Sequence, residues 1–151
     1  MKTLTFLIDT ENFKKFENLR LHLYENTKNY QFAFKNKFFS IIVEEFKELL
    51  KSNDAYKTTT DTNLVIKRGR RRIDEDKTYK TLSIGNIPQE TYQEFINIGY
   101  SIMTFEKNEN ADKYSTYYYM VKILNFVEKN TANIVSKYKE KEKNITFVKN
   151  A

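Results

Sequence analysis

Two stretches of the chain begin alike and decide the fold: residues 2–23 read KTLTFLIDTENFKKFENLRLHL, and residues 80–102 read KTLSIGNIPQETYQEFINIGYSI. Both open on Lys-Thr-Leu and then alternate apolar with polar residues, which is the period of a half-buried β-strand. Each stretch then changes to the spacing of an amphipathic helix. The pattern therefore predicts that a strand followed by a helix occurs twice in the chain.

The two predicted helices have matching apolar faces. The side-chain oxygens of Asp9 and Thr10 predict the start of the first helix, and Pro88, whose fixed φ suits a first helical turn, predicts the start of the second. The apolar positions pair at a constant offset: Phe13 with Tyr92, Phe16 with Phe95, Leu19 with Ile98, and Leu23 with Ile102. The strands match at an offset one residue shorter, which predicts a bulge at Gly85–Asn86.

A second, more apolar helix follows a polar stretch in each half. In the first half, over residues 34–50, the residues expected to point inward are Phe38, Phe39, Ile42, Val43, Phe46 and Leu49. In the second half, over residues 115–129 with Ser115 as the N-cap, they are Tyr119, Met120, Ile123, Leu124 and Val127. Strand, helix and helix therefore occur twice in the same order.

These patterns divide the chain into two units, a linker and an extension. The first unit is expected over residues 1–52 and the second over residues 79–130. Residues 53–78 form a polar linker in which Leu64–Ile66 would add one short strand. The linker also holds a basic cluster that either forms an arm tracking phosphates or pairs with the acids of Asp74–Asp76: Lys67, Arg68, Arg70, Arg71 and Arg72. Residues 131–151 form a charged C-terminal extension, and the alternating charges of residues 137–143 within it suggest a solvated helix or a frayed tail.

Composition excludes several classes of function. The 151 residues contain no Cys and one His, His22, so neither thiolate chemistry nor a histidine-based metal site is expected. No apolar run approaches the ~20 residues needed to span a bilayer, and the N-terminus lacks the pattern of a signal peptide, so a cytoplasmic protein is expected. Catalytic motifs are missing, and Glu25, Glu44 and Glu45 are expected on helix surfaces. No enzymatic activity, cofactor or metal is predicted.

The formal net charge of +6 would draw the protein to a polyanion, although a solvated lysine-rich surface fits the same charge. The order of the elements is stronger evidence for DNA binding than the net charge is. A strand of this kind has no partner within its own unit, and one two-helix unit buries little apolar surface. Antiparallel pairing of the two strands above four helices resolves both problems. The sequence therefore predicts a mainly α fold with a short β-ribbon, and such a ribbon fits the major groove of B-DNA.

This order of elements, over residues 2–50 and 80–129, resembles the ribbon-helix-helix (MetJ/Arc/CopG) superfamily, and within it the tandem, TraY-like arrangement. The resemblance implies an intramolecular pseudodimer that reads double-stranded DNA through the outward residues of its ribbon. Here these are Thr3, Thr5, Leu7, Thr81 and Ser83, with Asn86 or Gly85 next. It also implies phosphate contacts near the starts of the second helices, for which the candidates are Lys35, Asn36, Ser115 and Thr116. Lys2 and Lys80, at the starts of the predicted strands, are further candidates for contacting phosphates.

Within DNA binding, the resemblance favours an accessory protein of a plasmid or mobile element, acting at an origin of transfer. The alternatives are a transcriptional repressor, a copy-number or partition regulator, and an antitoxin-like module whose tail, Thr131–Ala151, binds a protein. The expected partners are double-stranded DNA, a relaxase or other plasmid protein, and further copies of the chain on DNA, without a membrane. Because Leu7 faces Asn86 or Gly85 and fused halves need not be identical, an imperfect or direct-repeat DNA site is expected.

Overall fold

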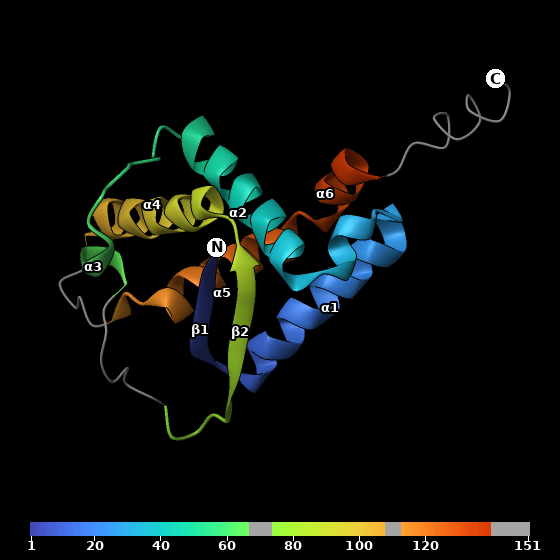
Figure 1. Ribbon diagram of the computed structural model, residues 1–151, viewed down its shortest axis with the longest axis horizontal. Helices are drawn as coiled ribbons and strands as arrows, with labels where there is room; N and C mark the ends of the chain where they lie inside the picture. The colour runs from blue at the N-terminus through green and yellow to red at the C-terminus, as the bar shows by residue number, and fades with distance from the viewer. Residues whose placement is uncertain (67–73, 108–112, 140–151) are drawn as a thin grey trace, which may run out of the picture.

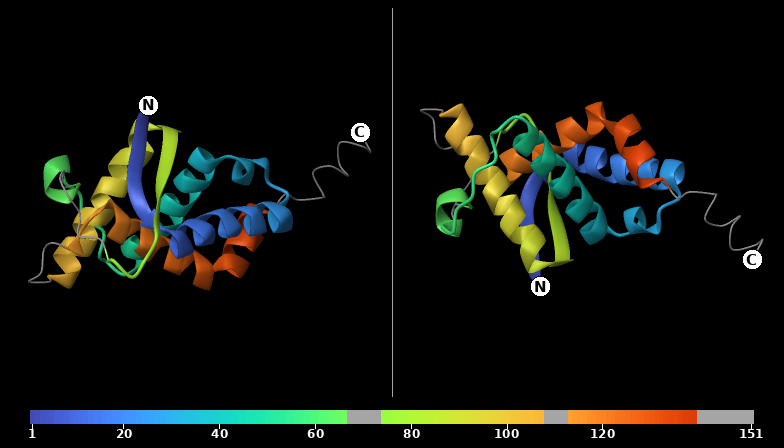
Figure 2. Two further views of the ribbon diagram at one scale, coloured as in Figure 1. Left: turned by 90° about the horizontal axis from the view of Figure 1, so that it is seen from below. Right: turned by 90° about the horizontal axis from the view of Figure 1, so that it is seen from above.

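The computed structural model describes residues 1–66, 74–107 and 113–139 and is mainly helical, with one two-stranded antiparallel sheet (Figure 1). The elements are β1 (Lys2–Asp9), α1 (Thr10–Thr27), the 3-10 turn η1 (Tyr30–Ala33), α2 (Lys35–Ser52), α3 (Thr62–Val65), β2 (Tyr79–Ile87), α4 (Gln89–Glu106), α5 (Thr116–Lys129) and α6 (Thr131–Tyr138). Figure 2 shows the strands side by side, with α1 and α4 leading away in opposite directions. The basic cluster of residues 67–72 lies outside the described residues.

The two strands pair along their whole length. The paired residues are Lys2 with Ile87, Leu4 with Ile84, Thr5 with Ser83, Phe6 with Leu82, Leu7 with Thr81, Ile8 with Lys80, and Asp9 with Tyr79. Leu7 therefore lies opposite Thr81, and the expectation that it faces Asn86 or Gly85 is wrong. The reason is the antiparallel direction, which sets the end of one strand against the beginning of the other.

The register shifts between Lys2 and Leu4, where β2 contains one residue more than β1. Asn86 has a φ of 55° at this point, a left-handed conformation that asparagine tolerates better than most residues. The predicted bulge at Gly85–Asn86 is thus confirmed. Its consequence is that Ile87, like Leu82 and Ile84, points inward and is buried.

The helix starts follow the sequence signals closely. Asp9 is the N-cap of α1, and Pro88 stands at the corresponding position before α4. Both helices have 18 residues, and both end at a lysine in the left-handed region, Lys28 and Lys107. The two halves therefore share the length of their first helix and its manner of ending.

A single hydrophobic core lies between the ribbon and the helices. Of the paired positions in α1 and α4, those buried are Phe16, Leu19, Leu23, Phe95, Ile98 and Ile102, while Phe13 and Tyr92 are partly buried. Five buried residues of α2 match the buried residues of α5 at a constant offset: Phe38 with Tyr119, Phe39 with Met120, Ile42 with Ile123, Val43 with Leu124, and Phe46 with Val127. These predictions are confirmed, except that Leu49 is only partly buried. Ile41 of α2 is also buried and has no buried counterpart in α5.

The predicted strand at Leu64–Ile66 is wrong, because Thr62–Val65 forms the short helix α3. The carboxylate of Asp61 accepts a hydrogen bond from the Leu64 backbone N–H at 3.1 Å and caps this turn. Val65 is fully buried, and its carbonyl accepts a hydrogen bond from the Tyr119 hydroxyl at 3.0 Å. A strand would need a third partner in the sheet, whereas one capped turn places Val65 in the core with its carbonyl bonded.

The described part of the C-terminal extension packs on the fold instead of extending into solvent. Ile134 of α6 is buried, and the ring of Tyr138 lies 5.9 Å from that of Phe32, centroid to centroid. The Tyr138 hydroxyl and the Lys137 ammonium both donate to Glu45 of α2, at 2.9 and 2.6 Å. The interpretation of residues 137–143 as a solvated helix or frayed tail is therefore wrong for Tyr138. Residues 140–151 lie outside the described residues.

Candidate nucleic-acid interface

The outer face of the ribbon carries the predicted base-reading side chains. Thr3, Thr5, Leu7, Thr81 and Ser83 are all exposed, while the residues alternating with them point toward the helices. The hydroxyl oxygens of Thr5 and Ser83 lie 3.0 Å apart across the strands. Leu7 is 41% exposed, although an apolar side chain gains by burial. The outer face of the ribbon therefore presents hydroxyl groups and one aliphatic side chain together.

The bulge forms one end of this face. Asn86 is exposed, and its backbone carbonyl accepts a hydrogen bond from the side-chain amide of Asn36 at 3.2 Å. At Gly85, an added Cβ would meet only the Thr3 hydroxyl, at 3.9 Å. The backbone is therefore accessible on the outer face here.

Two lysines lie at opposite ends of the ribbon. The Lys2 ammonium lies 5.5 Å from the centroid of the Tyr92 ring, and that of Lys80 lies 5.2 Å from the centroid of Phe13. In each case the lysine is the first or second residue of one half's strand, and the ring begins the apolar face of the other half's first helix. Cation–π attraction thus holds an exposed positive charge at each end.

The start of α2 borders β2. The Lys35 ammonium donates to the backbone carbonyl of Ser83 at 3.1 Å, in addition to the contact from Asn36. Phe34 stands at the N-cap position and offers no side-chain hydrogen bond to the first turn. The predicted phosphate-contacting residues Lys35 and Asn36 are thus brought next to the ribbon.

The start of α5 differs from that of α2. The Ser115 hydroxyl accepts a hydrogen bond from the Tyr118 backbone N–H at 3.2 Å and caps the helix. The Tyr117 hydroxyl donates to the Asp9 carboxylate at 2.6 Å. Ser115 and Thr116 are only partly exposed. The sequence predicted equivalent phosphate contacts in both halves, whereas the structure gives the two helix starts different surroundings.

Asp9 joins the two halves at this point. Its carboxylate also accepts hydrogen bonds from Asn12, at 3.2 Å from the backbone and 2.8 Å from the side chain. Burial raises the pKa of Asp9, but the hydrogen bonds from Tyr117 and Asn12 outweigh burial, and the pKa lies below its ordinary value of 3.8. A charged Asp9 therefore connects the end of β1, the start of α1 and the first turn of α5.

A second charged cluster, which the sequence did not indicate, lies where α4 ends beside α5. The Glu106 carboxylate lies 3.1 Å from the Lys113 ammonium and 2.7 Å from that of Lys122, and the Tyr118 hydroxyl donates to it at 2.7 Å. Burial raises the pKa of Glu106, but these contacts lower it to about 2. Its partners follow the polar connection between the helices, so no helical spacing could have shown them.

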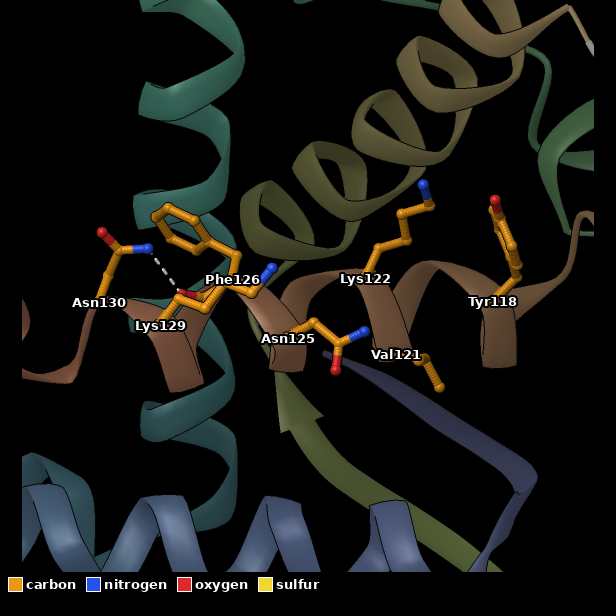
Figure 3. A pocket seen from close by; sticks show the side chains of 7 residues that line it. All are labelled: Tyr118, Val121, Lys122, Asn125, Phe126, Lys129 and Asn130. Carbon is orange, nitrogen blue, oxygen red and sulfur yellow. Dashed lines mark hydrogen bonds between the residues drawn. The ribbon is translucent and has the colours of Figure 1, made fainter.

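A groove along α5 offers no converging functional groups (Figure 3). Tyr118 and Lys122 point to one side of the helix, and Val121 and Asn125 point to the other. Lys122 is paired with Glu106, and the Asn130 side chain donates to the Phe126 carbonyl at 2.8 Å. Within the described residues, no group of three or more His, Cys, Asp or Glu side chains could hold a metal ion. No helix among them is long and apolar enough to cross a bilayer.

Comparisons with protein-family models, with curated protein sequences and with solved structures find no match to this chain.

Proposed function

We propose that the protein binds double-stranded DNA sequence-specifically by placing the ribbon of β1 and β2 in the major groove. The single observation that carries the proposal is the two-sided ribbon, whose inner face is buried while its outer face is exposed and rich in hydroxyl groups. In this proposal the two strand–helix–helix units act as an intramolecular ribbon-helix-helix pseudodimer. A two-stranded ribbon is narrow enough to enter the major groove.

The charges around the ribbon support a polyanionic ligand. Lys2 and Lys80 lie at its ends, and Lys35 lies beside β2, all three exposed. They add to the formal net charge of +6. Each phosphate that such a lysine neutralises releases condensed counterions, so binding should weaken as salt rises.

Each outward side chain has a role that its chemistry allows. Threonine and serine hydroxyls donate to or accept from base edges, the Asn86 amide suits adenine, and Leu7 can pack against a thymine methyl group. Leu7 has no aliphatic counterpart in β2, where the bulge at Gly85–Asn86 follows Ile84. The two halves of the DNA site are therefore expected to differ, which favours an imperfect or direct repeat.

The test begins with selection of bound duplexes from random DNA, followed by affinity measurement over a range of salt. A variant with Thr3, Thr5, Thr81 and Ser83 all changed to Ala should lose about 100-fold in specific affinity and retain binding to unrelated duplex. The control changes Thr58, Thr60 and Ser136 to Ala, which are exposed hydroxyl residues away from the ribbon. Unchanged specific affinity in the ribbon variant would refute base reading by this face.

The biological role stays a prediction within this proposal. An accessory protein at an origin of transfer, acting beside a relaxase, is preferred to a repressor, a copy-number or partition regulator, or an antitoxin-like module. Genes neighbouring this one would separate these roles. A relaxase gene supports the first, and a replication initiator or toxin gene supports the others.

A further inference from the structure

Three aromatic rings form a ladder between α1 and α2, here named the aromatic patch: Tyr24, which is partly buried, and the exposed Tyr30 and Phe34. The ring of Tyr30 lies 6.4 Å from that of Tyr24 and 5.3 Å from that of Phe34, edge to face in both pairs. Tyr30 is 66% exposed and Phe34 is 41% exposed. Apolar surface of this kind calls for an explanation, because burial would stabilise it.

The chain that carries the aromatic patch is held firmly. The Arg20 guanidinium donates to the carbonyls of Phe32 and Ala33 at 3.2 and 3.1 Å. The Asn29 side chain accepts from the Gln31 backbone N–H at 3.0 Å and donates to a carbonyl of α6 at 3.0 Å. Tyr30 and Phe34 flank the fully buried Phe32. Their exposure is therefore imposed by a fixed backbone.

The segment that carries Tyr30 and Phe34 is positively charged. Residues 28–37, KNYQFAFKNK, contain three lysines and no acidic residue. Lys28, Lys35 and Lys37 are all exposed, and the Lys37 ammonium lies 5.2 Å from the centroid of the Phe34 ring. Phosphates are the matching ligand for these charges, and bases are the matching ligand for open rings.

We propose that the aromatic patch binds single-stranded DNA, with unpaired bases stacked on Tyr30 and Phe34 and phosphates beside Lys28, Lys35 and Lys37. This site is separate from the reading face of the ribbon and goes beyond duplex recognition. Lys35 also contacts the Ser83 carbonyl of β2. A duplex that opens next to the ribbon would therefore offer its single strand to the aromatic patch.

The experiment measures binding of a labelled oligothymidylate of about 15 nucleotides to the full chain. Binding is monitored by fluorescence anisotropy at low and at moderate salt. The Tyr30→Ala/Phe34→Ala variant should bind this strand about tenfold more weakly. Its affinity for the selected duplex should change less than about threefold, since the ribbon is intact. Phe105→Ala is the control, because Phe105 is 75% exposed and lies on α4, outside the aromatic patch.

Thermal unfolding and size-exclusion chromatography of each variant keep the result interpretable. Equal binding of the single strand by the wild type and the double alanine variant would overturn the proposal. So would failure of the wild type to bind it at low salt, or a change of oligomeric state in the variant that accounts for the loss. The ribbon variant, with four alanines, should keep single-strand binding. Failure of duplex recognition is thereby distinguished from failure of the aromatic patch.

Discussion

Replacing Asp9 with Ala should destabilise the fold more than loss of a helix cap alone. The substitution removes the N-cap of α1, which is worth ~1 kcal/mol. It also removes the acceptor of the Tyr117 hydroxyl, and a short hydrogen bond to a charged group is worth about 1.5–3 kcal/mol. The oxygen–oxygen distance of 2.6 Å places this bond among the short ones. The free energy of unfolding should therefore fall by about 3 kcal/mol.

Urea denaturation of wild type, Asp9→Ala, Tyr117→Phe and the double variant measures the bond as a double-mutant cycle. The coupling energy should be about 2 kcal/mol, because each single variant removes the same hydrogen bond. Glu11→Gln is the control, since Glu11 is an exposed acid in the first turn of the same helix. A coupling energy below about 0.5 kcal/mol would refute the reasoning.

The same bond has a pH dependence of known sign. The pKa of Asp9 lies below its ordinary value of 3.8 in the folded protein, so the unfolded chain binds the proton first as the pH falls. The stabilisation is therefore complete above that ordinary value and is lost as the pH falls through the lower folded pKa. The difference in stability between wild type and Asp9→Ala should shrink over that acidic range.

Two further predictions concern packing and charge. Gly99→Ala should lower the free energy of unfolding by about 1–3 kcal/mol, because a Cβ there would lie 2.5 Å from Val65 Cγ1 and 2.7 Å from Tyr119 Cε2. Gly85→Ala is the control in thermal unfolding, because a Cβ there would meet only the Thr3 hydroxyl, at 3.9 Å. Equal melting temperatures for Gly99→Ala and the wild type would contradict the prediction. Glu106 has a pKa lowered from 4.5 to about 2, so its stabilisation is present above the first value and lost as the pH falls through the second. Urea titrations at about pH 5 and about pH 2 should show a larger difference in stability between wild type and Glu106→Gln at the higher pH than at the lower one.

Much of the fold could be predicted because its signals are local. The alternation in residues 2–8 and 80–87 predicted both strands, and the one-residue difference in offset predicted the bulge where Asn86 takes its positive φ. The inward faces of α2 and α5 followed from helical spacing, which depends only on neighbouring positions. The outward positions of Thr5 and Ser83 followed from the same alternation, and these residues are confirmed as exposed.

Contacts between segments that are distant in the chain could not be predicted from the sequence. Leu64–Ile66 has the composition of a strand, yet Val65 is buried against α4 and α5 in a helical turn. The charged run after Asn130 suggested solvent, yet Tyr138 docks against Phe32 and Glu45. In both cases a burial site formed by other elements decided the outcome, and local propensity is a weak guide against such a site.

The repeated strand and helices, their inward faces and the bulge were determined by the sequence alone, since each depends on residues within a few positions of one another. Tertiary structure decided how the two halves differ. It left the start of α2 beside β2 with Phe34, Lys35 and Lys37 exposed, and it tied the start of α5 to Asp9 through Tyr117. The physical reason is that a hydrogen bond between distant residues, or the exposure of a ring, depends on which segments fold next to each other. The spacing of residues along the chain does not determine this.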